Sequence, residues 1–150
     1  MATTAADRVF VDTNVLVFSS VVTAPLHAVA VQALGDLWSA GAELLLSRQI
    51  IREFLATLTR PQVYVAPQSP AVLAAEIGRL QTTLTILEDG PGVTSHLLQL
   101  LAAVPMGGKQ IHDANIVATM LQYNIPKLLT HNTADFARFS SFITVLTLVP

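Results

Sequence analysis

Four acidic side chains stand at places in the sequence where folding can bring charged groups to one site. Asp12 directly follows a short run of β-branched and aromatic residues, and Asp135 comes soon after another apolar run. Glu53 borders the apolar stripe of a helical pattern, and Asp113 opens another such pattern. A buried carboxylate is costly unless it is paired or bound to a cation. With only ten acidic residues in the chain, four in such positions indicate a common site.

The residue types favour a hard divalent cation at such a site. The chain has no cysteine, so oxygen ligands dominate, and these suit Mg²⁺ or Mn²⁺ better than Zn²⁺. Two carboxylates about 4 Å apart repel by about 4 kcal/mol at an effective dielectric constant of about 20. Three or four converging acids therefore raise one another's pKa or recruit a cation.

Each acid also has a purely structural interpretation that the residues alone leave open. Asp12 and Asp113 could serve as N-caps of the helices beside them. Glu53 could be a solvated helix residue, and Asp135 could cap a turn over residues 133–136. Only the set of four acids, together with their order along the chain, favours a common functional site over four separate structural roles.

The apolar pattern around the acids predicts strands that alternate with helices. Short buried strands are expected at 9–11, 44–46, 84–87, 127–130 and 142–148. Helices are expected after Asp12, between Pro25 and Gly41, between Ser47 and Pro61, at 70–83, at 93–104 and after Gly107-Gly108. Strongly apolar strands in this alternation predict a parallel sheet covered by helices, the α/β class. Asp12 falls at the carboxyl end of the first strand, where such sheets form their ligand crevices.

Length and composition limit the architecture. At 150 residues, one domain spanning 1–150 is expected, and the sequence contains no internal repeat. Hydrophobic residues make up 52% of the chain and charged residues 12%, which excludes disorder. So little charge leaves apolar surface that a homodimer interface would hide. The net charge of −2 argues against a protein that coats nucleic acid through its overall field.

One segment is long enough to compare with a membrane helix. No formal charge occurs between Asp12 and Asp36, a length that could span a bilayer. Polar residues and Pro25 interrupt the segment, and the acids at its start are atypical of a signal peptide. We therefore expect no membrane association and a cytoplasmic protein.

Four blocks of the sequence, taken in order, resemble a PIN domain. Residues 9–16 (VFVDTNVL) resemble its opening strand, and residues 52–54 (REF) resemble its second acidic position. Residues 108–118 (GKQIHDANIVA) resemble its third acidic position, and residues 129–136 (LTHNTADF) resemble its last. The resemblance spans nearly the whole chain and implies a three-layer α/β/α sandwich around a mostly parallel sheet. Within the family, the chain looks most like the VapC-type toxins of toxin–antitoxin pairs.

The resemblance implies an endoribonuclease that hydrolyses RNA phosphodiester bonds with the help of Mg²⁺ or Mn²⁺. It implies that Asp12 and Asp113 are the primary metal ligands and that Glu53 is a ligand or holds a metal-bound water. Many family members carry an acid where this chain has Asn132, whereas here the acid is Asp135, three residues later. The fourth site residue is therefore either Asn132 or Asp135, and Asp135 carries the charge.

Neighbouring side chains are expected to support the acids. Hydrogen-bonding roles fit Thr13, Asn14 and Thr130, although each also suits a turn or a strand. Basic residues that flank the four blocks and could meet phosphates are Arg48, Arg52, Lys109 and Arg138. His112 and His131 adjoin the acids in sequence, but strand alternation predicts that His131 points away from the Thr130 side chain.

The resemblance further implies an RNA substrate, an antitoxin protein as a partner and a homodimer. Two other functions remain open. A PIN-like module could bind RNA or protein without cleavage, although the presence of Asp12, Glu53 and Asp113 argues against it. A phosphatase of the haloacid dehalogenase type also begins with a strand followed by Asp, but its chemistry needs a second Asp where this chain has Asn14.

Overall fold

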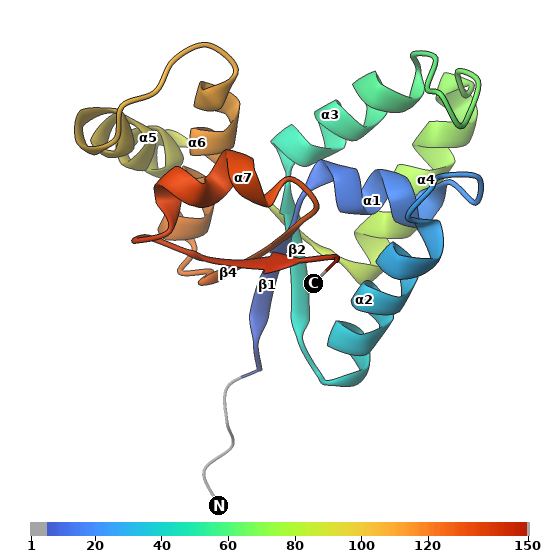
Figure 1. Cartoon of the computed structure of the whole chain (residues 1–150), viewed down its shortest axis with the longest axis horizontal. Coiled ribbons are helices and arrows are strands. Elements are labelled where there is room, and N and C mark those ends of the chain that lie inside the picture. The colour runs from blue at the N-terminus through green and yellow to red at the C-terminus, as the bar shows by residue number, and fades with distance from the viewer. Residues whose placement is uncertain (1–5, 150) are drawn as a thin grey trace, which may run out of the picture.

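The computed structural model describes residues 6–149, and a five-stranded sheet forms its centre (Figure 1). The strands are β1 (Arg8–Val11), β2 (Glu43–Ser47), β3 (Thr85–Leu87), β4 (Lys127–Thr130) and β5 (Thr144–Thr147). Their order is β3-β2-β1-β4-β5, and every neighbouring pair is parallel. The predicted α/β class is confirmed, and the sheet is wholly parallel rather than mostly so.

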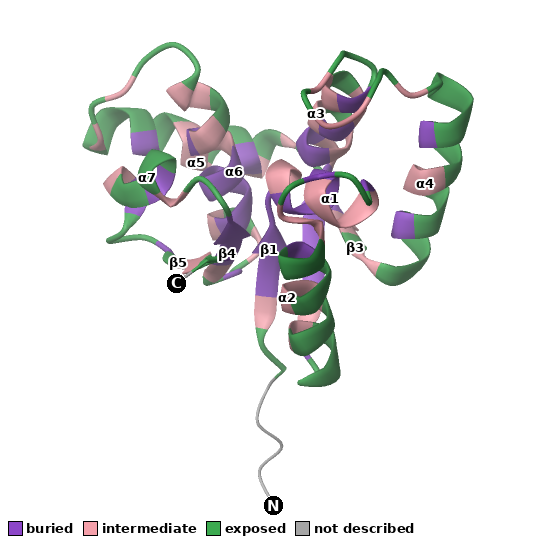
Figure 2. Ribbon diagram, turned by 45° about the vertical axis from the view of Figure 1, so that its right-hand side comes forward, coloured by how far each residue is buried: buried purple, intermediate pink, exposed green. Residues whose placement is uncertain are grey.

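Helices cover both sides of this sheet. They are α1 (Thr13–Ser20), α2 (His27–Ser39), α3 (Arg48–Leu58), α4 (Pro70–Thr83), α5 (Pro91–Ala103), α6 (Gln110–Gln122), α7 (Thr133–Phe136) and the 3₁₀ turn η1 (Ala137–Phe139). α1 to α4 lie on one side of the central strands, and α5 to α7 lie on the other (Figures 1 and 2). This layering is the three-layer sandwich that the resemblance implied.

The core forms where the strands read as continuous apolar runs. Val9, Phe10 and Val11 of β1 are fully buried, as are Leu45 and Leu46 of β2. A parallel strand covered by helices on both faces has no side toward water, so its sequence does not alternate. Figure 2 shows this contrast between the buried central strands and the exposed outer sides of the helices.

The uncharged segment after Asp12 divides into α1 and α2. Pro25 does not open the second helix as predicted, because the chain makes a turn there in which the His27 amide bonds to the Ala24 carbonyl at 3.1 Å. The helix begins only at His27. Among residues 6–149, no helix combines the length and the hydropathy needed to cross a membrane.

Two further local predictions differ from the structure. Ser47 occupies the N-cap position of α3, but its hydroxyl makes no capping bond and is buried without a partner in the described chain. The last strand is shorter than predicted, at Thr144–Thr147, because the amides of Phe142 and Ile143 both bond to the Phe139 carbonyl. These bonds extend the turn that follows η1 into residues 142 and 143, which the apolar pattern had assigned to the strand.

The strand order creates a switch point beside β1. The chain builds β2 and β3 on one side of β1 and then crosses to build β4 and β5 on the other. Ligand crevices of open α/β sheets form at the carboxyl edge near such a point. Asp12 follows β1 directly and Thr130 ends β4, so this topology brings both residues to one edge.

Candidate active site

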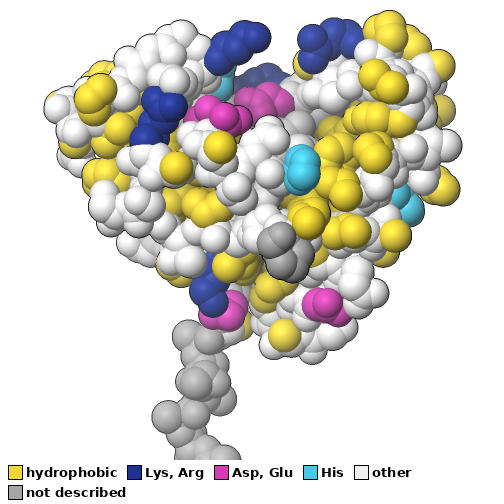
Figure 3. All heavy atoms as spheres, viewed as in Figure 1, with side chains coloured by type: hydrophobic (Ala, Val, Ile, Leu, Met, Phe, Trp, Pro, Cys, Tyr) yellow, Lys and Arg dark blue, Asp and Glu magenta, His cyan; other side chains and the backbone are white. Residues whose placement is uncertain are grey.

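A cavity of about 730 Å³ opens at this edge of the sheet, and all four predicted acids line it. Asp12 precedes α1, Glu53 lies on α3, Asp113 on α6 and Asp135 on α7. Figure 3 shows the hollow between the two groups of helices, with acidic side chains inside and Lys or Arg side chains on both rims. The fold therefore brings together the four acids that the sequence analysis selected.

Asp12 is the most buried of the four acids, with 6% of its surface exposed. Its Oδ1 accepts the Thr13 amide at 2.7 Å, so the side chain caps α1. Its Oδ2 accepts the Thr130 hydroxyl at 2.7 Å and the Asn14 amide group at 3.2 Å. Burial raises the pKa of Asp12 above its ordinary value, and the charge of Glu53 adds to this effect, although the hydrogen bonds oppose it.

Thr130 and Asn14 fasten Asp12 to the loop that follows β4. Thr130 is fully buried, and its hydroxyl also accepts the Asn132 amide at 3.0 Å. Asn14 Oδ1 accepts the His131 amide at 3.0 Å. The structure thus gives Thr130 and Asn14, two of the predicted supporting residues, side-chain hydrogen bonds within the site, while the exposed Asn132 takes part through its backbone.

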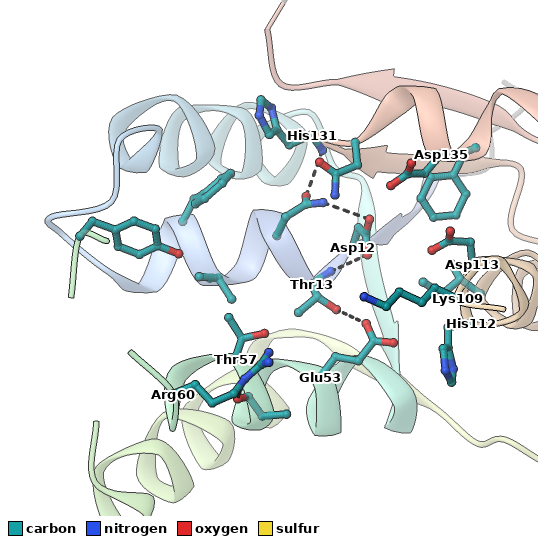
Figure 4. A pocket seen from close by; sticks show the side chains of 18 residues that line it. Asp12, Thr13, Glu53, Thr57, Arg60, Lys109, His112, Asp113, His131 and Asp135 are labelled. Carbon is teal, nitrogen blue, oxygen red and sulfur yellow. Dashed lines mark hydrogen bonds between the residues drawn. The ribbon is translucent and has the colours of Figure 1, made fainter. Parts of the chain in front are cut away.

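Both carboxylate oxygens of Glu53 accept hydrogen bonds. The Thr13 hydroxyl donates to Oε2 at 2.7 Å, and Gln49 Nε2 donates to Oε1 at 2.8 Å. Figure 4 shows Thr13 and Glu53 joined in this way at one wall of the cavity. Side-chain bonds from two directions restrict the rotation of this carboxylate.

Gln49 is a site residue that the sequence analysis missed. It is 6% exposed, and its Nε2 also donates to the His112 carbonyl at 2.9 Å. Its Oε1 accepts Asn115 Nδ2 at 2.8 Å. Gln49 therefore ties α3, which carries Glu53, to α6, which carries Asp113. Its spacing of four residues before Glu53 is the signal that places both side chains on one helix face.

Asp113 and Asp135 form the other side of the acidic region. The pKa of Asp113 is raised from 3.8 to about 6, chiefly by burial and then by the charges of Asp135, Asp12 and Glu53, while Arg138 opposes the shift. Asp113 lies in the first turn of α6 but not at its N-cap. Asp135 is exposed in the first turn of α7, where no side-chain capping bond is formed. Neither acid is explained as a helix cap.

The donor set fits a hard cation by its chemistry. In residues 6–149 no salt bridge involves any of the four acids, and burial together with their mutual repulsion raises the pKa of Asp113. Carboxylate oxygens are the ligands that Mg²⁺ and Mn²⁺ prefer. Within the same described range, no three His, Asp or Glu side chains are grouped closely enough to hold a metal ion as they stand.

Two basic residues line the cavity from opposite walls (Figure 4). One is Lys109, which the sequence analysis selected, and the other is Arg60, which it missed. Arg60 lies two residues past the end of α3, so helical spacing from Glu53 gives no firm signal for it. The other predicted cations do not line the cavity: Arg48, Arg52 and Arg138. Arg48 instead pairs with Glu88 at 2.7 Å.

Comparisons with known proteins agree with this architecture. The sequence matches the PIN domain family over residues 9–141. The structure of VapBC-1 from nontypeable Haemophilus influenzae has a TM-score of 0.69 and 17% identity, over 95% of this chain and 99% of that chain. A toxin–antitoxin complex from Klebsiella pneumoniae has a TM-score of 0.65 and 19% identity, over 96% and 98% of the two chains.

Another similar structure is VapC20 from Mycobacterium tuberculosis, described as a sarcin-ricin loop cleaving toxin. Its TM-score is 0.60 at 20% identity, over 80% of this chain and 86% of that chain. A search of curated protein sequences finds no match. At these identities the structural likeness establishes the fold.

Proposed function

Because the chain belongs to the PIN domain family, we propose that it is a metal-dependent endoribonuclease that hydrolyses RNA phosphodiester bonds. The observation that carries this proposal is the convergence of Asp12, Glu53, Asp113 and Asp135 on one cavity, where no salt bridge among the described residues neutralises them. Burial, together with the charges of the other three acids, raises the pKa of Asp113 to about 6, and a divalent cation would relieve this unfavourable charge.

Asp12 and Asp113 would hold Mg²⁺ or Mn²⁺, and Glu53 would be a third ligand or orient a water. When bound, such a cation supplies an activated water and stabilises charge on the scissile phosphate. Thr130 and Asn14 hold Asp12 in place, and Thr13 holds Glu53. A carboxylate that is already fixed loses less entropy when it orients a reactant.

The basic residues would bind the RNA backbone. Lys109 and Arg60 line the cavity and form no salt bridge with a described residue. Phosphate contacts of this kind position a strand without reading its sequence. Because the net charge of the chain is −2, attraction to RNA would come from these local contacts rather than from the overall field.

We further propose that the protein is the toxin of a type II toxin–antitoxin pair and acts in the cytoplasm. The similarity to structures described as VapBC and toxin–antitoxin complexes supports an antitoxin partner. Exposed apolar side chains such as Trp38 and Leu98, in a chain with only 12% charged residues, support a homodimer.

The test is a metal titration with two substrates, RNA and a phosphomonoester. We expect the wild-type protein to cleave RNA with Mg²⁺ or Mn²⁺ and to lose activity in EDTA. Asp12→Asn should lower the rate by at least about 100-fold, the upper range for changes around metal ligands. Asp36→Asn, an exposed acid on α2 outside the cavity, is the matched control.

The outcomes separate the competing functions. RNA that is bound but not cleaved at any metal concentration would indicate a non-catalytic module. Hydrolysis of the phosphomonoester alone would indicate a phosphatase. Equal rates in Asp12→Asn and Asp36→Asn would refute the assignment of the acids.

A further inference from the structure

The cavity contains a second region, lined by aromatic rings rather than acids. Phe18 of α1, Tyr64 and His131 line it from three separate segments of the chain. The ring centroid of Phe18 lies 6.5 Å from that of Tyr64 and 5.6 Å from that of His131. Figure 4 shows His131 and Arg60 on the side of the cavity away from Asp113.

Core packing does not account for the whole of this group. His131 is exposed, and Phe18 and Tyr64 are only partly buried. The planes of Phe18 and Tyr64 are inclined by 67°, and those of Phe18 and His131 by 71°, so both contacts are edge to face. In such a contact one ring offers only its edge, and its faces stay free of the other ring.

We propose that these three rings form a subsite for one unpaired nucleobase of an RNA strand whose phosphate lies at the acids. This inference rests on the proposed ribonuclease function. Single-stranded RNA is bound by stacking of splayed bases on aromatic and His side chains, with cations along the backbone. One cavity here holds both parts, because Arg60 and Lys109 line it together with the three rings.

Charge favours a nucleic acid over a peptide in this position. A peptide attracted to the four acids would be basic and would meet Arg60 and Lys109 at the walls. A nucleotide offers phosphates to those cations and an uncharged flat base to the rings. A nucleotide strand is therefore the occupant that suits all three groups. Its phosphates would contact the cations, its base would contact the rings, and a metal ion would join it to the acids.

The experiment measures binding by the full chain with cleavage silenced by Asp113→Asn. The probes are fluorescent single-stranded oligo-U and oligo-A, and an abasic ribose-phosphate strand of the same length, with Mg²⁺ present. In this background we add His131→Ala or Tyr64→Leu, and we expect about 5- to 150-fold weaker binding of the strands with bases. Binding of the abasic strand should not change.

Two further variants serve as controls. Tyr64→Phe keeps the ring and should bind as the parent does. Phe142→Leu removes an aromatic ring that is 40% exposed outside the cavity and should also bind as the parent does. Thermal melting of each variant checks that the fold is retained.

Several results would overturn the subsite. Unchanged binding of oligo-U and oligo-A by both ring variants would do so, as would equal weakening of the abasic strand. Loss of a co-purifying protein partner with RNA binding intact would assign the rings to that partner. If the wild-type protein cleaves RNA in any of these cases, only the subsite fails. If it neither binds nor cleaves RNA, the proposed function fails too.

Discussion

The Thr13 hydroxyl donates a 2.7 Å hydrogen bond to Glu53 and so joins the start of α1 to the middle of α3. Thr13 also offers its amide to Asp12, the preceding residue. One residue therefore holds two carboxylates that belong to different elements. Because these bonds are formed within the protein, the spacing of the two acids does not depend on substrate.

Thr13→Val removes this hydroxyl with little change in side-chain shape. We expect a loss of about ten-fold or more in cleavage rate, because a hydrogen bond to a charged group contributes about 1.5–3 kcal/mol. Thr13→Ser keeps the donor and should retain most of the activity. Single-turnover cleavage of RNA by the two variants checks this, and a fully active Thr13→Val would contradict the positioning role.

Asp113→Asn should stabilise the metal-free protein at neutral pH. The pKa of Asp113 is about 6 in the folded chain against 3.8 ordinarily, so the folded state binds the proton more tightly. The free energy of unfolding therefore falls as pH rises from about 4 to about 6, where the carboxylate ionises. After allowance for solvent screening, we expect a gain of about 1 kcal/mol at pH 7, or about 2–4 °C in Tm.

Melting curves in EDTA at pH 7 and pH 4 test this prediction. At pH 4 Asp113 is protonated in the folded state, so the wild type and Asp113→Asn should melt within experimental error of one another. A variant that is less stable than the wild type at pH 7 would contradict the repulsion described for the acids.

Asp135→Asn should weaken metal binding and cleavage more than it affects folding. The exposed Asp135 is the charge with the largest influence on the pKa of Asp113, and no capping bond is assigned to it. Asn132→Ala should have a smaller effect on the rate, since Asn132 joins the site through its backbone amide. Metal titration and thermal melting of both variants measure the effects on metal affinity and on stability. A lower Tm with unchanged metal affinity in Asp135→Asn would make this residue structural.

Gln49→Leu should lower both stability and activity. It leaves the His112 carbonyl and the Asn115 amide group without their buried partner, which costs about 1–3 kcal/mol in the free energy of unfolding. It also frees one oxygen of Glu53. Urea denaturation and cleavage assays measure the two effects.

Gln32→Leu is the matched control for this substitution. Gln32 makes the same type of bond four residues along a helix, to Asp36 at 2.7 Å, but on the exposed surface of α2. We expect a change within about 0.5 kcal/mol and normal cleavage. Equal losses in Gln32→Leu and Gln49→Leu would show that the network around Glu53 has no special role.

The apolar surface predicts a homodimer. Leu98 is 60% exposed on α5, and Trp38 is 57% exposed on α2. Light scattering across a dilution series should give twice the chain mass of 16.0 kDa at micromolar concentration. A soluble monomer that does not aggregate at that concentration would contradict this prediction.

The sequence allowed the acids to be found because each lies in a recognisable local pattern. Asp12 was placed by the apolar strand before it, and the observed β1 ends at Val11 as expected. Gln49 and Arg60 were missed, although Gln49 shares α3 with Glu53 and Arg60 lies two residues past the end of this helix. Helical spacing marks which side chains share a face, but only the strand order and the packing of α3 against α1 determine which face meets the cavity.

Local sequence patterns also failed to show which basic residues line the cavity and where some helices and strands begin. Arg48 and Lys109 both flank an acidic block, yet of the two only Lys109 lines the cavity. Arg48 instead forms a salt bridge with Glu88, which follows β3. That pairing joins residues forty positions apart and leaves no local signal. Pro25 was assigned to a helix start by its usual preference, which a tight turn overrides here.

The position of β1 between β2 and β4 also has a consequence for how the protein is made. Asp12 and Glu53 leave the ribosome well before Asp113 and Thr130, since synthesis runs from the N-terminus. Until Thr130 has emerged, β1 lacks one of its two neighbours and Asp12 lacks the hydrogen bond from the Thr130 hydroxyl. A nascent chain therefore carries no complete acidic cavity, and the proposed ribonuclease activity would arise only after Thr130 has emerged.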